Sequence, residues 1–272
     1  MLPATYTQSH QGRWEAAVEW ARRAGRKTLE YFQSDNFEVV RKSDASPVTI
    51  ADQQAEQFIR GELAKHFPQD GILGEEFGTV PGESGYQWII DPIDGTKSFI
   101  YGVPLYATLV GLLYEDQPVA GVIYIPGMDE LIHAAIGQGA FHEVAGKPIR
   151  RAQVARSRSL REGLFVTSQV DTFDKRGATS VFQAIQGQAY VTRTWGDAYG
   201  YLLVATGRAE VMVDPKVSPW DVAAVLPIIE EAGGRFTDWK GNRTVHGGDG
   251  VATNGELHDE LLKLLGGENS QT

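Results

Sequence analysis

The sequence contains no cysteine. Disulfide bonds and thiolate metal ligands are therefore excluded, and any metal site is directed toward hard cations that prefer oxygen ligands, such as Mg²⁺ or Mn²⁺. The six histidines are scattered, and none lies at the spacing of a metal-binding pair such as His-x-x-x-His. We therefore assign no catalytic role to histidine.

Long hydrophobic runs are also absent. There is no stretch of about 18 apolar residues and no basic start followed by an apolar segment, so we expect a soluble cytoplasmic protein. Basic residues are outnumbered, with 25 Lys and Arg against 35 Asp and Glu, and the formal net charge is -10. Because nucleic acids and anionic membranes attract clustered positive charge, neither is an expected partner.

A chain of 272 residues with 42% hydrophobic content can bury a large core. No low-complexity linker divides it, and we predict a single domain over residues 1–272. The first half, 1–150, combines two amphipathic helices with an antiparallel sheet, and the second half, 151–272, alternates strands and helices. We interpret the turn-rich segment 239–248 as a plain hairpin and surface loop. The predicted helices are 14–32, 49–67, 180–185, 198–205 and 222–232, and the predicted strands are 87–90, 105–113, 119–125, 131–135, 163–167, 189–192 and 211–213.

Acidic residues follow or interrupt apolar runs at three places far apart in the chain, residues 74–76, 91–96 and 220–221. A carboxylate is costly to bury unless it is paired or coordinates a metal ion. The three clusters therefore predict a site for a divalent cation rather than a solvated face.

The segment 91–96 is the most informative of the three. A short buried strand runs directly into Asp91, and the proline and glycine that follow oppose a simple continuation of that strand. Asp94 precedes Gly95 and Thr96, whose backbone N–H groups could point at an anion. One short loop could thus hold a metal ion and a phosphate together. For an isolated Asp-Gly pair, the alternative is an ordinary turn between strands.

Residues 88–99, WIIDPIDGTKSF, resemble the first signature of the inositol monophosphatase-like, magnesium-dependent phosphatases. Their later signature is similar to residues 220–234, which begin with Trp220 and Asp221 and end in EEAGG. The two early acidic positions of that family match Asp52 and Glu75. Order and spacing agree from roughly residue 12 to residue 265, and the two long motifs together are highly specific.

This resemblance implies an α+β fold, a layered αβαβα sandwich whose metal site lies between the antiparallel half and the later half. It implies Mg²⁺ as the cofactor, as two or three ions, with Mn²⁺ as a possible substitute. Carried over by motif, the metal ligands are Glu75, Asp91, the carbonyl of Ile93, Asp94 and Asp221, and the catalytic residues are Glu75, Thr96 and Asp52.

In the implied reaction, a metal-activated water attacks the phosphate of a monoester without a covalent intermediate. Glu75 and the Thr96 hydroxyl would orient that water, Asp52 would support Thr96 through a hydrogen bond, and the phosphate would bind the amides of Gly95 and Thr96. Asp52 is also explained without catalysis, because it lies in the first turn of the predicted helix 49–67, where a carboxylate favours the helix dipole. The alternative for an Asp-rich motif, an aspartyl-phosphate enzyme, usually shows a different Asp-x-Asp arrangement.

Residues 97–104 and 196–201 resemble the histidinol-phosphate branch of this superfamily, which implies hydrolysis of L-histidinol phosphate to L-histidinol and phosphate. Asp214 matches the position that binds the organic part of the substrate, and a carboxylate there suits an ammonium and an imidazole. Arg193 and Asp197 are candidates for the same pocket. Arg193 could equally pair with a neighbouring acid, and Asp197 could cap the helix that follows it.

Two other functions stay open at this point. An inositol-1-phosphate phosphatase, or a broad-specificity small-molecule phosphatase, would share every metal ligand and differ only around Arg193, Asp197 and Asp214. A non-catalytic metal-binding regulatory protein would keep the fold and lack the chemistry, although every acid expected for metal binding is present. The expected partners are a small phosphate monoester and, from the resemblance alone, a second copy in a homodimer.

Overall fold

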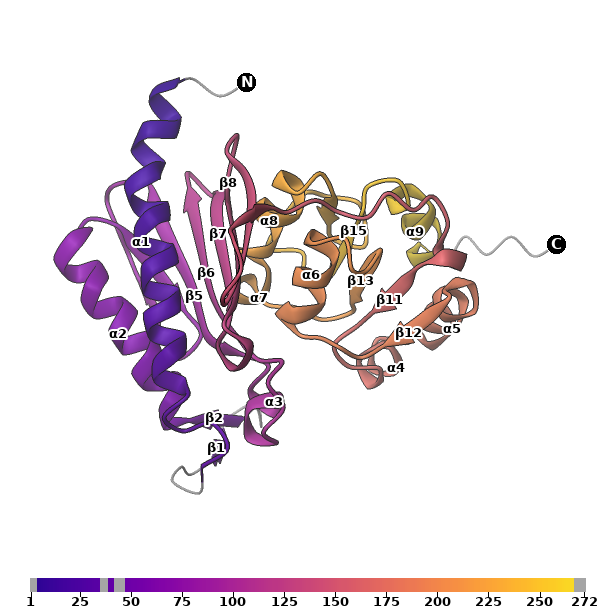
Figure 1. The fold of residues 1–272 in the computed structure, drawn as a ribbon, viewed down its shortest axis with the longest axis horizontal. Helices are drawn as coiled ribbons and strands as arrows, with labels where there is room; N and C mark the ends of the chain where they lie inside the picture. The colour runs from indigo at the N-terminus through magenta and orange to yellow at the C-terminus, as the bar shows by residue number, and fades with distance from the viewer. Residues whose placement is uncertain (1–3, 35–38, 42–46, 267–272) are drawn as a thin grey trace.

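The computed structural model describes residues 4–34, 39–41 and 47–266. Helices and sheets of these residues stack in the order helix, sheet, helix, sheet, helix (Figure 1). This arrangement confirms the predicted α+β fold and its αβαβα layers. No helix in the described ranges has the length and apolar character needed to span a bilayer.

The first sheet comprises eight strands of the described chain, in the order β10-β9-β8-β7-β6-β5-β3-β4. Strands β6 to β8 form the predicted antiparallel meander, β5 and β9 extend it on either side, and β3 lies parallel to β5. The unpredicted strands β3, β4, β9 and β10 are short or partly exposed, so their apolar pattern is weak. The bounds are β3 Gly71–Gly74, β4 Gly78–Val80, β5 Tyr86–Asp94, β6 Ala107–Tyr114, β7 Gln117–Ile125, β8 Glu130–Ala135, β9 Gly139–Val144 and β10 Arg150–Arg151.

Helices α1 (Ala4–Thr28) and α2 (Ile50–His66) cover the outer face of this sheet (Figure 1). Their apolar stripes, which include Trp20 and Ile59, pack against Trp88 of β5. Helix α2 agrees with the prediction. Helix α1 ends earlier than predicted, at a residue whose hydroxyl donates to the carbonyl of Gly25, and hydrogen-bonded turns continue from there. A two-stranded antiparallel ribbon, β1 (Val39–Arg41) and β2 (Pro47–Thr49), precedes α2.

The second sheet contains five described strands, in the order β12-β11-β13-β15-β14. Strand β11 lies parallel to both β12 and β13, as expected for alternating strands and helices, whereas β13, β15 and β14 are antiparallel. The bounds are β11 Leu164–Val166, β12 Val191–Arg193, β13 Val211–Asp214, β14 Arg235–Thr237 and β15 Gly250–Thr253.

Three helices fill the layer between the two sheets, α6 (Ala198–Ala205), α7 (Pro219–Val222) and α8 (Val225–Glu231). The predicted helix 222–232 is therefore wrong at its start, because α7 and α8 are separate. Pro227 explains the break, since it has no N–H to donate to the carbonyl four residues earlier. The largest hydrophobic core lies in this layer and includes Leu202, Leu226 and Ile229.

The outermost layer consists of α4 (Asp171–Lys175), α5 (Thr179–Gln188) and α9 (His258–Leu265). These helices bury Phe173, Phe182 and Leu261 against the second sheet. Helix α9 was not predicted, and segment 239–248 joins β14 to β15 as a hairpin connection but is not wholly at the surface, because Trp239 is buried. A short helix, α3 (Thr96–Ile100), and two 3₁₀ turns, Pro126–Met128 and Leu160–Glu162, complete the described elements.

Candidate active site

Three carboxylates from the two halves of the chain meet between the sheets. Oxygen atoms of Asp91, Asp94 and Asp221 all lie within 4.8 Å of one another. Strand β5 does not end at Asp91 as predicted but continues to Asp94. Its pairing register with β6 shifts between Asp91 and Asp94. This irregular segment turns two nearby carboxylates toward one point. Asp221 belongs to α7, where its carboxylate accepts a hydrogen bond from the backbone N–H of Ser218 at 2.7 Å.

The electrostatics of this cluster favour a bound cation. Burial raises the pKa of Asp91 well above its ordinary value, and the charge of Glu75 adds to this increase. Burial and the charge of Asp197 do the same for the pKa of Asp94, and burial raises the pKa of Asp221 to about 7. Asp91 Oδ1 is buried and has no hydrogen-bond partner in the described chain. A group of carboxylate oxygens, of which Asp91 Oδ1 has no hydrogen-bond donor among the described residues, fits a hard divalent ion.

Glu75 follows strand β3 and faces the same cluster, as its effects on the pKa values of Asp91 and Asp221 show. Its position depends on Glu56 of α2, a residue that the sequence motifs do not include. The buried Glu56 carboxylate accepts hydrogen bonds from the N–H groups of Glu76 and Phe77, at 2.8 and 3.2 Å. Glu56 precedes Glu76 by 20 residues, and nothing in the sequence around Glu56 indicates this role.

The predicted hydrogen bond between Asp52 and Thr96 is not formed. Asp52 Oδ2 accepts instead from the backbone N–H and the hydroxyl of Thr49, at 2.8 and 2.6 Å, in a capping box at the start of α2. The Thr96 hydroxyl donates to the carbonyl of Ile93 at 3.2 Å. Asp52 Oδ1 is buried and lacks a hydrogen-bond partner among the described residues, and burial raises the pKa of Asp52 to about 6.

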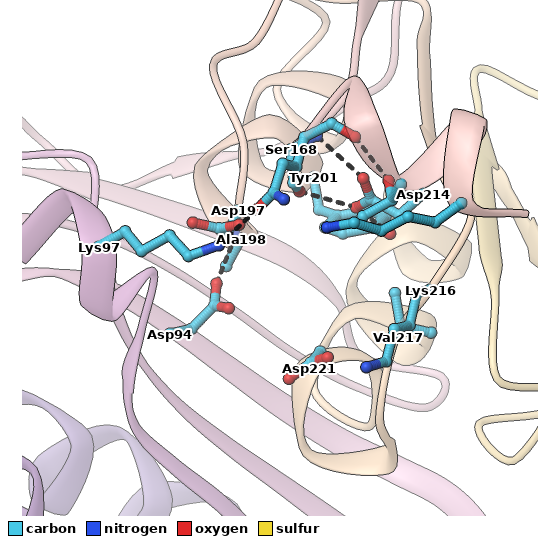
Figure 2. Close-up of a pocket in the computed structure, with 13 residues that line it drawn as sticks. Asp94, Lys97, Ser168, Asp197, Ala198, Tyr201, Asp214, Lys216, Val217 and Asp221 are labelled. Atoms are coloured by element: carbon cyan, nitrogen blue, oxygen red, sulfur yellow. Dashed lines mark hydrogen bonds between the residues drawn. The ribbon is translucent and has the colours of Figure 1, made fainter. Parts of the chain in front are cut away.

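Gly95 lies at a close approach of the two halves of the chain. Its φ is 83°, a left-handed conformation that favours glycine, and a Cβ atom there would lie 2.7 Å from Asp197 Oδ2. Helix α3 (Thr96–Ile100) starts at the next residue. The predicted capping by Asp197 is not formed, because its side chain makes no capping hydrogen bond. The Asp94 carboxylate accepts from the N–H of Ala198 instead, and so caps α6 across the interface (Figure 2).

A cavity of about 470 Å³ opens beside the carboxylates (Figure 2). Four acids lie in its wall, which fits the predicted acidic pocket, but three lysines line it as well. The sequence motifs include only one of these lysines and give it no role. The lining residues are Asp94, Lys97, Ser168, Gln169, Thr172, Lys175, Asp197, Ala198, Tyr201, Asp214, Lys216, Val217 and Asp221.

Asp214 lies in the cavity wall as predicted, but its oxygens are already engaged. Oδ1 accepts from the N–H of Ser168 at 2.9 Å and the hydroxyl of Thr167 at 3.3 Å, and Oδ2 accepts from the hydroxyls of Ser168 and Tyr201, both at 3.0 Å. Burial still raises the pKa of Asp214 to about 6. Four donors occupy most of the accepting capacity of a carboxylate, so Asp214 chiefly ties α6 to the end of β11.

Arg193 does not line the cavity. Its guanidinium is exposed, donates to the carbonyl of Thr192 at 2.8 Å and lies 5.7 Å from the ring centre of Trp195. No ion pair of Arg193 exists within the described chain, so neither its pocket role nor its pairing with an acid is seen. Strand β12 lies at the sheet edge, and Arg193 is not among the residues that line the cavity.

Comparison with known proteins agrees with this geometry. A sequence model described as the inositol monophosphatase family matches residues 11–269. A histidinol-phosphatase of Chlorobaculum parvum is 42% identical over 93% of this chain and 96% of the relative, and one of Mycobacterium tuberculosis is 39% identical over 92% and 96%. The crystal structure of the extragenic suppressor protein suhB from Bartonella henselae superposes with a TM-score of 0.86 at 30% identity, covering 94% of this chain and 98% of that one. The chain belongs to the inositol monophosphatase family.

Proposed function

We propose that this protein is a Mg²⁺-dependent phosphomonoesterase that hydrolyses L-histidinol phosphate to L-histidinol and phosphate. The observation that carries the proposal is the cluster of Asp91, Asp94 and Asp221, with an unsatisfied buried oxygen on Asp91, beside a cavity that is also lined by Asp197 and Asp214. The relatives from Chlorobaculum parvum and Mycobacterium tuberculosis named histidinol-phosphatase support the choice of substrate.

The ligands proposed for two or three Mg²⁺ ions, or for Mn²⁺ in their place, are the three clustered aspartates, Glu75 and the carbonyl of Ile93. The ions would supply positive charge that activates water and offsets the charge of the phosphate. All but one of these groups are carboxylates, and the pKa of Asp91 and of Asp94 is raised in the protein alone. Binding a cation therefore relieves repulsion that the fold has placed there.

The chain itself would hold the phosphate and orient the attacking water. The N–H groups of Gly95 and Thr96, at the start of α3, face the phosphate in this proposal. Because the Thr96 hydroxyl donates its proton to the carbonyl of Ile93, its oxygen is left to accept from water. Glu75 is the second acceptor for that water. Water oxygen bonds to phosphorus and gives up a proton to Glu75, the bond to the ester oxygen breaks with its electron pair, and that oxygen leaves as the alcohol after taking up a proton from solvent.

Recognition of the cationic organic group is assigned to Asp197, supported by Asp214. Asp197 lines the cavity and makes fewer hydrogen bonds, so its carboxylate is the better contact for an ammonium. Asp214, held by four donors, contributes negative charge at longer range. Because Arg193 does not line the cavity, we assign it no part in substrate binding.

We also propose that the protein forms a homodimer. Light scattering after size-exclusion chromatography would test this, and the exposed Tyr190 and Trp195, near the edge strand β12, are candidate contacts.

The test is a comparison of kcat/KM for phosphate release from L-histidinol phosphate, inositol 1-phosphate and 3′-phosphoadenosine 5′-phosphate, with Mg²⁺ and with EDTA. We expect a preference of about a hundredfold for L-histidinol phosphate, which corresponds to about 2.7 kcal/mol. Similar rates for all three would establish a broad-specificity phosphatase instead. Cation binding without turnover of any of them would indicate the non-catalytic regulatory alternative.

A further inference from the structure

Lys97 lies on α3, two residues after Gly95, and reaches across the cavity to the second half of the chain (Figure 2). Its ammonium donates to Oε1 of Gln169 at 2.6 Å. The side chain is exposed to the cavity and lowers the pKa of Asp197 by its charge, although burial outweighs this effect and leaves that pKa raised. A positive group thus stands beside the place where the phosphate is proposed to bind.

The partner of Lys97 is a neutral amide, and no ion pair of Lys97 within 4.0 Å is formed in the described chain. Lys175, on the opposite wall, differs because its ammonium pairs with Asp171 at 2.7 Å. A lysine ammonium forms stronger hydrogen bonds to an anion than to an amide oxygen. Its long, flexible stem also lets the charge move by several ångströms at little cost. Lys97 is therefore available to a phosphate in a way that Lys175 is not.

We propose that Lys97 is a phosphate-binding residue of this site, whose ammonium leaves Gln169 and bonds a non-bridging oxygen of the phosphoryl group when a substrate or phosphate is bound. This assignment rests on the proposed function for the position of the phosphate. The contact joins α3 to the anion on the side away from Asp221, and it adds positive charge that the carboxylate cluster cannot provide. Gln169 holds the ammonium in place when the cavity contains no anion.

The experiment replaces Lys97 by methionine, which keeps the length of the stem and removes the charge. Isothermal titration calorimetry with inorganic phosphate, in the presence of Mg²⁺, measures Kd for phosphate without turnover. Steady-state kinetics on L-histidinol phosphate give KM and kcat separately. We expect K97M to raise Kd and KM about tenfold or more and to change kcat by less than about threefold, because the contact is made before and during reaction. K97R should recover most of the affinity.

Two further variants keep the interpretation specific. K147M removes an exposed charge in a turn outside the cavity and should leave Kd for phosphate unchanged. K216M removes a lysine from the opposite wall of the cavity. An equal loss of phosphate affinity in K97M and K216M would overturn the proposal. The loss would then come from the lower positive charge of the whole cavity and not from a direct bond between Lys97 and the phosphate. Unchanged affinity in K97M, with a normal melting temperature, would also overturn it. If the wild-type protein fails to hydrolyse L-histidinol phosphate, the proposed substrate is wrong, and the phosphate titration still decides the role of Lys97.

Discussion

Asp91 is the residue on which the candidate site depends most. Its carboxylate is 2% exposed, lies beside two other aspartates, and has one oxygen without a partner in the described chain. An isolated buried carboxylate is among the costliest groups that a core can contain. Such a group persists where a ligand compensates it, and this argument makes Asp91 the central residue of the proposed cation site.

Replacing Asp91 by asparagine should abolish turnover and weaken Mg²⁺ binding, because the charge that bridges the proposed ions is lost. In EDTA the variant should melt no lower than the wild type, since removing one charge relieves the repulsion that raises the pKa of Asp91. Calorimetric Mg²⁺ titration and thermal melts measure both effects. D259N, which changes an exposed acid on α9, is the matched control. Turnover equal to wild type in D91N would contradict the cation model.

His258 is a buried residue with a stability role instead of a catalytic one. Its ring lies between the hydroxyls of Thr237 and Thr253, at 2.9 and 3.0 Å, and burial lowers its pKa from 6.5 to about 4. The folded state therefore resists protonation that the unfolded chain accepts. The stability contributed by His258 is complete above pH 6.5 and is lost as the pH falls from 6.5 toward 4.

Urea unfolding of the wild type and of H258Q over this pH range measures that contribution. Between neutral pH and the lower pKa, the wild type should lose about 3 kcal/mol more than H258Q, at about 1.4 kcal/mol for each pH unit. H66Q, at an exposed histidine, should follow the wild-type curve. Parallel curves for the wild type and H258Q would show that His258 titrates alike in the folded and unfolded states.

Among the elements, strands β6 and β7 set the position of α7 and therefore of Asp221. Glycines on these strands allow the chain between α7 and α8 to approach the sheet closely. A Cβ atom on Gly111 would lie 2.7 Å from the side chain of Ala223, and one on Gly121 would lie 2.1 Å from the carbonyl oxygen of Ala224. The second contact is with backbone, which cannot move aside without moving the helix.

Gly121→Ala should destabilise the protein by about 1 to 3 kcal/mol, the typical cost of overpacking a core site. It should also weaken Mg²⁺ binding, because α7 and Asp221 must shift. Gly61→Ala in α2 is the matched control, since a Cβ atom there meets nothing within 4 Å, and it should be neutral or slightly stabilising. Denaturant unfolding and Mg²⁺ titration of both variants provide the measurement. Equal stability of the two variants would show that the sheet and α7 are not in the tight contact described.

Local sequence predicted many elements because they depend on short-range signals. Helix α2 begins one residue after its capping threonine and carries a regular apolar stripe, so its bounds follow from the sequence. The predicted helix 222–232 and the unpredicted α9 show the limit of such signals. Whether a weakly patterned segment is helical depends on the surface against which it packs, and that surface is formed by distant parts of the chain.

For the whole molecule, the two halves contribute to a single charged interface. Asp91 and Asp94 come from the first half, whereas Asp197, Asp214 and Asp221 come from the second. Protons and cations compete for these groups. Burial raises the pKa of Asp221 to about 7, so the folded state binds a proton more tightly than the unfolded chain does. In the metal-free protein, this contribution to stability is present at low pH and is lost as the pH rises toward 7.

Mg²⁺ should therefore stabilise the protein more as the pH rises. The increase in melting temperature caused by saturating Mg²⁺ should be larger at about pH 8 than at about pH 5, where protons occupy the site. D221N should show a smaller increase at both values and a weaker dependence on pH, because Asp91 and Asp94 still bind protons in competition with the cation. Scanning calorimetry in matched buffers, with EDTA as the reference, gives the result. A Mg²⁺ effect independent of pH would mean that the ions bind away from these carboxylates.

The sequence by itself predicted the aspartates that the candidate site brings together. Asp91, Asp94, Gly95 and Thr96 lie at the end of a strand and beside a left-handed glycine, and these two features are specified by six adjacent residues. The later motif placed Asp221 in the same way, through a short helix with its own capping residues. The α+β fold and its layers followed from the resemblance of the two long motifs to a known family, because the order of strands and helices is compatible with other α+β arrangements as well.

Only the tertiary structure decided what those residues contact. Asp94 caps α6, Asp214 is occupied by four donors, Asp52 bonds Thr49 instead of Thr96, and Lys97 reaches Gln169. Most of these partners are far apart in the chain, and a hydrogen bond depends on tenths of an ångström between atoms. Such distances are set by the packing of the two sheets on the helices between them. No pattern within either half of the sequence contains that information.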